Sequence, residues 1–335
     1  MLVAGDRAVI LGAWAAAARY LSAALELWPA GDPGRVEAEA LLGRALRWTG
    51  KLTAEFLDAR IAAARAPGRD DLVAEAEMAY AFYWWDRSRY ELVDEHMHAA
   101  LALVSDKPAS PSKASILHQA AIRGLVAGDL ATSKALAEEA AGMARESMAR
   151  TVRALIALAR GDVRAADEEN KRILAQARAA ADPQVLYPAL ALATRAALAA
   201  ARRDEAEQLF AELTSGNPER QEAAPFPGIA TVALVATELG PAPDWLAPRE
   251  PVQTPWRAAA AAAARGDFAE AAEIYASMGA RPDEADARLY AARTLAAQGQ
   301  RSLADEHLRR ALAFYREVGA TAYLREAESL LAASA

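Results

Sequence analysis

The sequence predicts an all-α fold, an α-solenoid in which antiparallel helix pairs stack as a right-handed superhelix. Apolar residues recur at helical spacing along the 335 residues, and no stretch alternates as a strand would. A short turn, usually Gly followed by a polar residue, recurs between helices at even intervals. Gly128 and Gly161 are 33 residues apart, as are Gly266 and Gly299. A fixed period of this size is typical of stacked helical repeats.

Each predicted pair follows one local pattern. An aromatic or apolar residue opens the helix after the turn and a small residue follows three positions later, as in Trp14 and Ala17 after Gly12. Gly adopts the left-handed conformation without a Cβ penalty, and Asp after it can cap the next helix. Arg-Gly-Asp occurs at 160–162 and 265–267, in both cases in register with this turn. We therefore interpret it as a turn and not as an adhesion motif.

Proline divides the predicted stack. Seven prolines fall within residues 214–253 and interrupt the rhythm of the repeats. The spacing predicts one helix there, over about residues 228–239. We expect an N-terminal repeat array over residues 1–213, a Pro-rich interruption with one helix over 214–255, and C-terminal pairs over 256–335. The last of these ends in a single closing helix over 320–335.

Composition excludes several function classes. The formal net charge of −7 argues against direct binding to nucleic acid or to an anionic membrane, because both attract clustered Lys and Arg. The chain has no cysteine, which is compatible with a cytoplasmic protein. Its first residues lack the pattern of a signal peptide, and no apolar run is long enough to span a bilayer.

The sequence carries no recognisable catalytic set. It has no phosphate-binding loop, no dinucleotide fingerprint and no nucleophile elbow. Its four histidines, at positions 96, 98, 118 and 307, lack the spacing of a metal site. We therefore predict that the chain is not an enzyme and that it binds no metal and no cofactor.

The repeats resemble tetratricopeptide repeats (TPRs), whose period is about 34 residues. More narrowly, the two ends of the chain resemble the C-terminal TPR region of large bacterial signalling ATPases. The matching segments are residues 4–8 with 12–14, and residues 311–321 with 325–331. Those proteins join the repeats to an ATPase module with a cyclase domain, or are LuxR/MalT-like regulators. The resemblance implies a sensor or scaffold arm attached to an ATPase or cyclase module. The short start before Gly12 also favours a segment of a longer chain.

In a TPR the first helix of each pair lines the concave groove, which the resemblance makes the place for a partner. Aromatic, Met and Arg side chains gather there, and these types dominate binding hot spots. Counting back from the turns predicts the following groove residues: Arg44, Arg47, Met78, Phe82, Trp85, His118, Ile122 and Thr151. Core packing is the alternative for Phe82 and Trp85. Trp85→Ala separates the two, because a groove residue would affect binding and not thermal stability.

The leading interpretation is therefore a non-catalytic protein-interaction or sensor scaffold, the regulatory arm of a bacterial signalling or transcription-regulating protein. A protein or peptide would occupy the groove. One alternative is a free-standing TPR adaptor. Another is a receptor for a small inducer, which predicts an enclosed aromatic-lined pocket near Phe82 and Trp85.

Overall fold

The computed structural model describes residues 1–29, 32, 34–66, 68–143, 146–180, 183–215, 228–243, 246 and 254–332. Helices make up nearly all of this part, and it contains no β-strand. The all-α class predicted from the sequence is confirmed. Contacts divide the chain into two compact units, the first over Met1–Gln119 and the second over Ala120–Ala141, Glu146–Pro248 and Pro255–Ala335.

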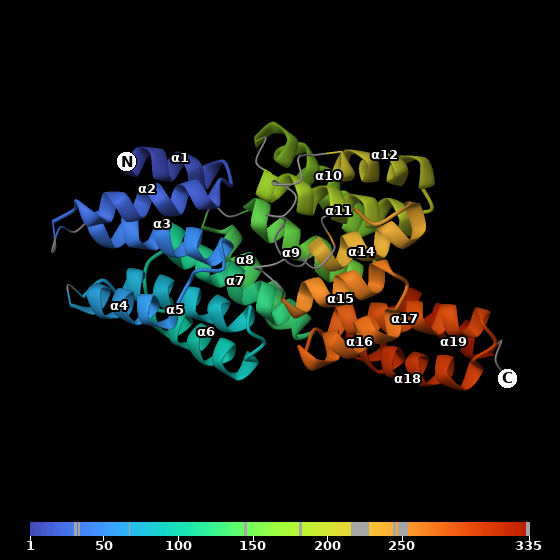
Figure 1. The fold of residues 1–335 in the computed structure, drawn as a ribbon. Coiled ribbons are helices and arrows are strands. Elements are labelled where there is room, and N and C mark those ends of the chain that lie inside the picture. The colour runs from blue at the N-terminus through green and yellow to red at the C-terminus, as the bar shows by residue number, and fades with distance from the viewer. Residues whose placement is uncertain are drawn as a thin grey trace. The chain divides into compact units, whose positions relative to one another are not determined.

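The first unit is built from helix pairs joined by tight turns (Figure 1). From α1 to α6 each helix packs on the next, and the first helices of successive pairs, α1, α3 and α5, also touch. Apolar stripes meet in two clusters, one around Trp14, Leu21 and Leu42 and the other around Leu57 and Val73. The helices are α1 (Leu2–Ile10), α2 (Trp14–Glu26), α3 (Gly34–Trp48), α4 (Ala54–Arg65), α5 (Asp70–Trp85), α6 (Tyr90–Val104) and the start of α7 (Pro111–Val126).

The second unit continues the same arrangement. Its apolar clusters lie around Val152 and Ile156 on α9 and around Leu308 and Tyr315 on α18. Its helices are the end of α7, α8 (Leu130–Ala141), α9 (Glu146–Ala159), α10 (Val163–Ala180), α11 (Pro183–Ala199), α12 (Arg203–Thr214), α14 (Gly228–Leu239), α15 (Pro255–Ala264), α16 (Phe268–Ser277), α17 (Arg281–Ala297), α18 (Arg301–Val318) and α19 (Thr321–Ala332).

Left-handed residues mark the turns between paired helices. In six such turns the residue is Gly, with φ between 68° at Gly161 and 82° at Gly266. Ser88 and Ala201 take the same conformation with φ of 57° at the corresponding place in two other turns. The predicted turn therefore keeps its left-handed conformation even where Ser or Ala stands in place of Gly.

Aspartates after the glycines cap the second helices, as predicted. Their Oδ1 atoms accept backbone N–H bonds three residues on, at 3.0 Å for Asp129, 3.1 Å for Asp162 and 3.1 Å for Asp267. Two of these aspartates belong to the Arg-Gly-Asp copies, so both copies are turns with a capping role.

Within the Pro-rich segment the predicted helix is confirmed as α14, Gly228–Leu239, and it is buried from Gly228 to Ala236. Residues 216–227 and 247–253 lie outside the described residues. The proposed boundaries at 213 and 255 therefore stay a prediction. The closing helix is confirmed as α19.

Candidate functional site

Helix α5 carries an unusual concentration of aromatic residues and distributes them over two faces. Glu77, Tyr80 and Trp84, at i, i+3 and i+7, face α4 and α6 and line a pocket. Phe82 is not among these lining residues. It was predicted from the sequence to line the groove formed by the first helices of the pairs. Because α5 has a neighbour on more than one side, both aromatic faces find contacts within the fold.

Three of the predicted groove residues reach the surface of the first unit. Arg44 on α3 is exposed, and Arg47 and Phe82 are half-buried. The Arg47 guanidinium lies 4.1 Å from the centre of the Phe82 ring, and its Nε is 3.2 Å from Oδ2 of Asp86. We call Arg44, Arg47 and Phe82 the Arg–Phe surface. The contacts of Arg47 hold its planar cation in place beside a partly buried aromatic ring.

Three other predicted groove residues are buried. The exposed fractions are 5% for Met78, 5% for Trp85 and 7% for His118. Trp85 ends α5, where the first turn of the next helix covers it, and its ring lies 6.0 Å from that of Tyr90 in an edge-on contact. Trp85 therefore packs inside the helix pair, the alternative that the sequence left open, and its part in binding stays a prediction.

The last two predicted residues, Ile122 and Thr151, belong to the second unit and are half-buried. Ile122 packs against the apolar cluster around Val152. The Arg–Phe surface is therefore the part of the predicted site that lies in the first unit and reaches solvent.

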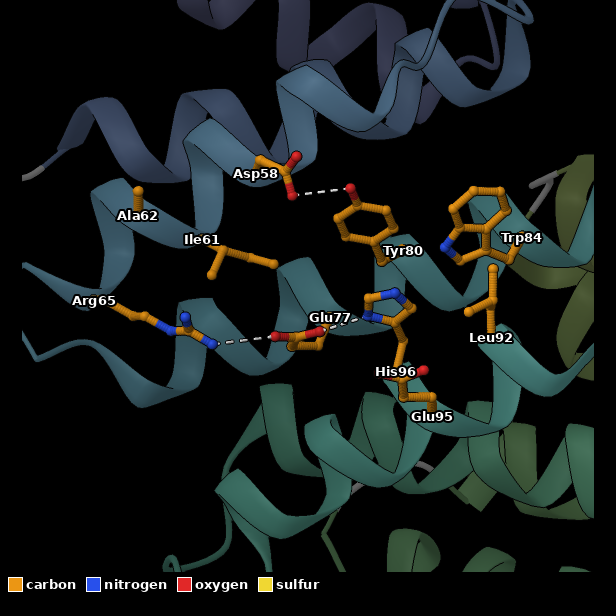
Figure 2. Close-up of a pocket in the computed structure, with 10 residues that line it drawn as sticks. All are labelled: Asp58, Ile61, Ala62, Arg65, Glu77, Tyr80, Trp84, Leu92, Glu95 and His96. Carbon is orange, nitrogen blue, oxygen red and sulfur yellow. Dashed lines mark hydrogen bonds and ion pairs between the residues drawn. The ribbon is translucent and has the colours of Figure 1, made fainter. Parts of the chain in front are cut away.

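The pocket on the other face of α5 was not anticipated from the sequence. It has a volume of about 400 Å³, and one face of each of three helices lines it (Figure 2). The lining residues are Asp58, Ile61, Ala62 and Arg65 of α4, Glu77, Tyr80 and Trp84 of α5, and Leu92, Glu95 and His96 of α6. Each stripe is regular at helical spacing. No one helix shows that the three stripes converge, which is why the sequence alone does not reveal the pocket.

Buried polar groups organise the floor of this pocket. Tyr80 donates its hydroxyl to Oδ1 of Asp58 at 2.9 Å, and its ring stacks on His96 with centres 4.3 Å apart. Nδ1 of His96 lies 2.7 Å from Oε2 of Glu77. Burial, and next the hydrogen bond with Asp58, raise the pKa of Tyr80 to about 12. The phenol therefore stays protonated at neutral pH and serves as a donor.

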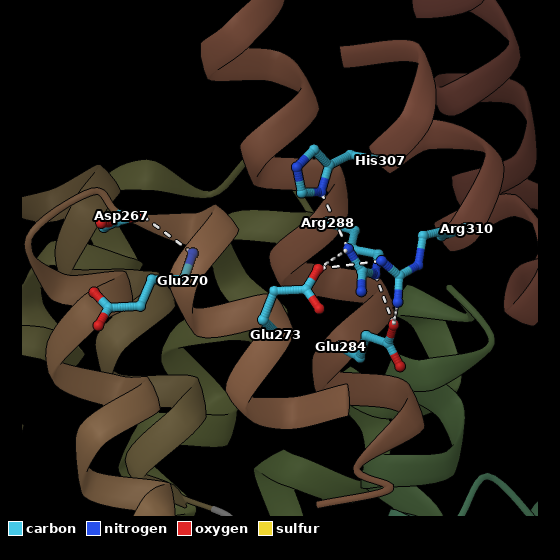
Figure 3. A network of polar contacts seen from close by, with 7 residues as sticks. All are labelled: Asp267, Glu270, Glu273, Glu284, Arg288, His307 and Arg310. Carbon is cyan, nitrogen blue, oxygen red and sulfur yellow. Dashed lines mark hydrogen bonds and ion pairs between the residues drawn. The ribbon is translucent and has the colours of Figure 1, made fainter. Parts of the chain in front are cut away.

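The second unit holds a network of charges around a buried arginine (Figure 3). Arg288 on α17 is 1% exposed, and it pairs with Oε1 of Glu284 at 2.6 Å and with Oε1 of Glu273 at 3.1 Å. His307 and Arg310 on α18 complete the network. Burial, and next the charge of Arg288, lower the pKa of His307. Because two carboxylates neutralise the arginine, we interpret this network as holding α16, α17 and α18 together.

A second ion pair joins α17 to α11. Asp286 pairs with Arg195 of α11 and accepts the Tyr315 hydroxyl at 3.2 Å. Asp283, one turn earlier, has its pKa raised to about 7 by burial and by the charge of Asp286, while Arg195 opposes the shift. These groups link α11, α17 and α18 within the second unit.

Over the part of the chain that the structure describes, no three His, Asp or Glu side chains gather as metal ligands. Within the same residues, no helix is both long and apolar enough to cross a bilayer.

The fold is similar to solved helical-repeat structures. A Rap protein complexed with competence and sporulation factor aligns with a TM-score of 0.51 at 12% identity, covering 100% of this chain and 98% of that one. A signal transduction ATPase with numerous domains and a tetratricopeptide repeat sensor, from Pyrococcus horikoshii, aligns with a TM-score of 0.41 at 13% identity, covering 91% of this chain and 44% of that one. No protein-family model and no curated protein matches the sequence. Together with the repeat spacing and the capped turns, the first likeness shows that the chain has the fold of the tetratricopeptide-repeat proteins.

Proposed function

We propose that the chain is a non-catalytic scaffold that binds a protein or peptide partner. One observation carries this proposal: the fold corresponds over its full length to that of a Rap protein that was solved in complex with competence and sporulation factor. A stack of helix pairs offers an extended surface, and its repeats let many side chains contact one partner.

Binding is assigned to the Arg–Phe surface of α3 and α5. Arginine and aromatic side chains are enriched in binding hot spots, and here both types lie side by side in reach of solvent. Asp86 and Phe82 hold the Arg47 side chain in one place. Less conformational entropy is lost when a partner binds a side chain that is already ordered.

A regulatory role in a bacterial signalling protein is the finer part of the proposal. It rests on the resemblance of the two chain ends to the TPR regions of signalling ATPases, and it includes an attached ATPase or cyclase module and a cytoplasmic location. A small inducer in place of a peptide remains the alternative that this resemblance supports.

The test is a selection of phage-displayed peptides on the immobilised full chain, with and without the double change Arg44→Ala and Phe82→Ala. Peptides that the unchanged chain retains should bind the variant at least about tenfold more weakly, as expected for loss of a hot spot. The matched control is Leu303→Ala, at a side chain of the second unit that is 49% exposed. Equal retention by all three proteins, or no enriched peptide, would contradict the proposal.

A further inference from the structure

The pocket between α4, α5 and α6 is a second candidate site, separate from the Arg–Phe surface. Its lining residues on α5 are Glu77, Tyr80 and Trp84, and Phe82 is not among them. The walls come from the second helices of two successive pairs, α4 and α6 (Figure 2). A partner in this pocket would contact α4, α6 and a face of α5 that does not carry Phe82.

The charge of the pocket is negative. Asp58, Glu77 and Glu95 contribute three carboxylates, against one guanidinium from Arg65 and the ring of His96. Asp58 and Glu95 are exposed at the rim, whereas Glu77 lies at the floor with its side chain 9% exposed. A buried carboxylate needs a cation or donors close by, because burying an unpaired charge is costly.

The cation that the fold itself supplies to Glu77 is loosely held. Arg65 approaches Oε1 of Glu77 at 3.5 Å, and its side chain is 66% exposed. An ion pair of this length with a solvated partner contributes little free energy, so another cation can replace it at small cost. His96 holds the second oxygen of Glu77 through Nδ1. One carboxylate oxygen is thus fixed in place while the other faces an exchangeable guanidinium.

Aromatic rings line the part of the pocket beyond His96, whose ring stacks on Tyr80 (Figure 2). The rings of Tyr80 and Trp84 lie 6.3 Å apart at an interplanar angle of 18°. A guanidinium presents a planar fork of donors to a carboxylate, which an ammonium lacks, and Arg65 shows that Glu77 accepts a guanidinium at Oε1. A volume of about 400 Å³ leaves room for one long side chain.

From these contacts we propose that the pocket binds the guanidinium of an arginine side chain presented by a protein partner. The incoming guanidinium replaces that of Arg65 on Oε1 of Glu77, with Glu95 adding attraction at the rim. This gives the chain a docking point that does not require the Arg–Phe surface.

The test uses a minimal probe and the full ¹⁵N-labelled chain. N-acetylarginine methylamide is titrated while the indole N–H signal of Trp84 is followed by NMR, with the signal assigned through Trp84→Phe. N-acetylcitrulline methylamide, which is neutral and nearly the same shape, is the matched probe. A saturable shift with the arginine probe and none with the citrulline probe is expected.

Three variants test the geometry. Arg65→Ala removes the competing cation and should tighten binding by about two- to fivefold, and Glu95→Gln should weaken it by a similar factor. Glu168→Gln, a matched change on α10 with a 57% exposed side chain, should leave binding unchanged.

Equal shifts with the two probes, no shift with either, tighter binding of N-acetylglutamate methylamide, or weaker binding after Arg65→Ala would overturn the proposal. Peptides selected on the Arg–Phe surface should bind the Glu95→Gln variant normally. Failure in this pocket is therefore distinguishable from failure of the proposed function.

Discussion

Ala201 holds a left-handed backbone that glycine holds in six comparable turns, and at a φ of 57° its Cβ crowds the backbone. Ala201→Gly should therefore stabilise the chain by about 1 kcal/mol, which urea unfolding followed by circular dichroism would measure. Gly266→Ala should cost a similar amount, because nothing lies within 4 Å of the added Cβ and only the backbone is strained.

The control for this pair is Ala175→Gly, an exposed position inside α10, where the same substitution should destabilise by about 1 kcal/mol. A destabilised Ala201→Gly variant would show that the turn does not depend on the left-handed residue.

The buried carboxyl of Asp283 predicts that the stability of the fold depends on pH. Its folded pKa of about 7, raised by burial and Asp286, lies above the unfolded value. Between about pH 4 and 7 the native chain therefore holds a proton that the unfolded chain has released, so the free energy of unfolding falls as pH rises through this window. Asp283→Asn removes the charge, and it should raise the melting temperature at pH 8 and change it little at pH 4.

The matched control is Asp6→Asn on α1, at an exposed carboxylate in the first unit, which should have almost no effect at either pH. An Asp283→Asn chain that melts earlier than the unchanged chain at pH 8 would show that the ionised carboxylate is stabilising.

Helix α5 carries one aromatic residue that packs in the core and another that reaches the surface. Trp85 is 5% exposed and Phe82 is only partly buried, although both were predicted for one surface. Trp85→Ala should cost about 3–5 kcal/mol by leaving a cavity inside the helix pair. Phe82→Ala should cost less than about 2 kcal/mol, because it removes a half-solvated ring and one cation–π contact. Urea unfolding of both variants would check this order, and the reverse order would place Trp85 at the surface after all.

The elements also show what the sequence can and cannot reveal. Helix α14 and the capped turns at Asp129, Asp162 and Asp267 were predictable, because proline, glycine and caps act within a few residues. The burial of Trp85 was not, because it depends on Tyr90 in the next helix closing over it. The pocket beside Tyr80 was missed for the same kind of reason, since it needs three helices to converge.

For the whole molecule, periodicity alone predicted the repeat fold, because each pair packs mainly on its neighbours and local rules therefore extend along the chain. The division of contacts between Gln119 and Ala120, within α7, has no local signal of this kind. The partner also leaves no signature in the periodicity, because the same packing residues support any surface.

The proposed function places a partner on the first-helix face of α3 and α5. The most direct measurement is the dissociation constant of a selected peptide, by isothermal titration calorimetry, for the unchanged chain, Phe82→Ala and Leu303→Ala. Loss of a hot-spot ring predicts an increase of at least about tenfold for Phe82→Ala, with no change for Leu303→Ala. An unchanged dissociation constant for Phe82→Ala, in a chain that remains folded, would contradict the claim.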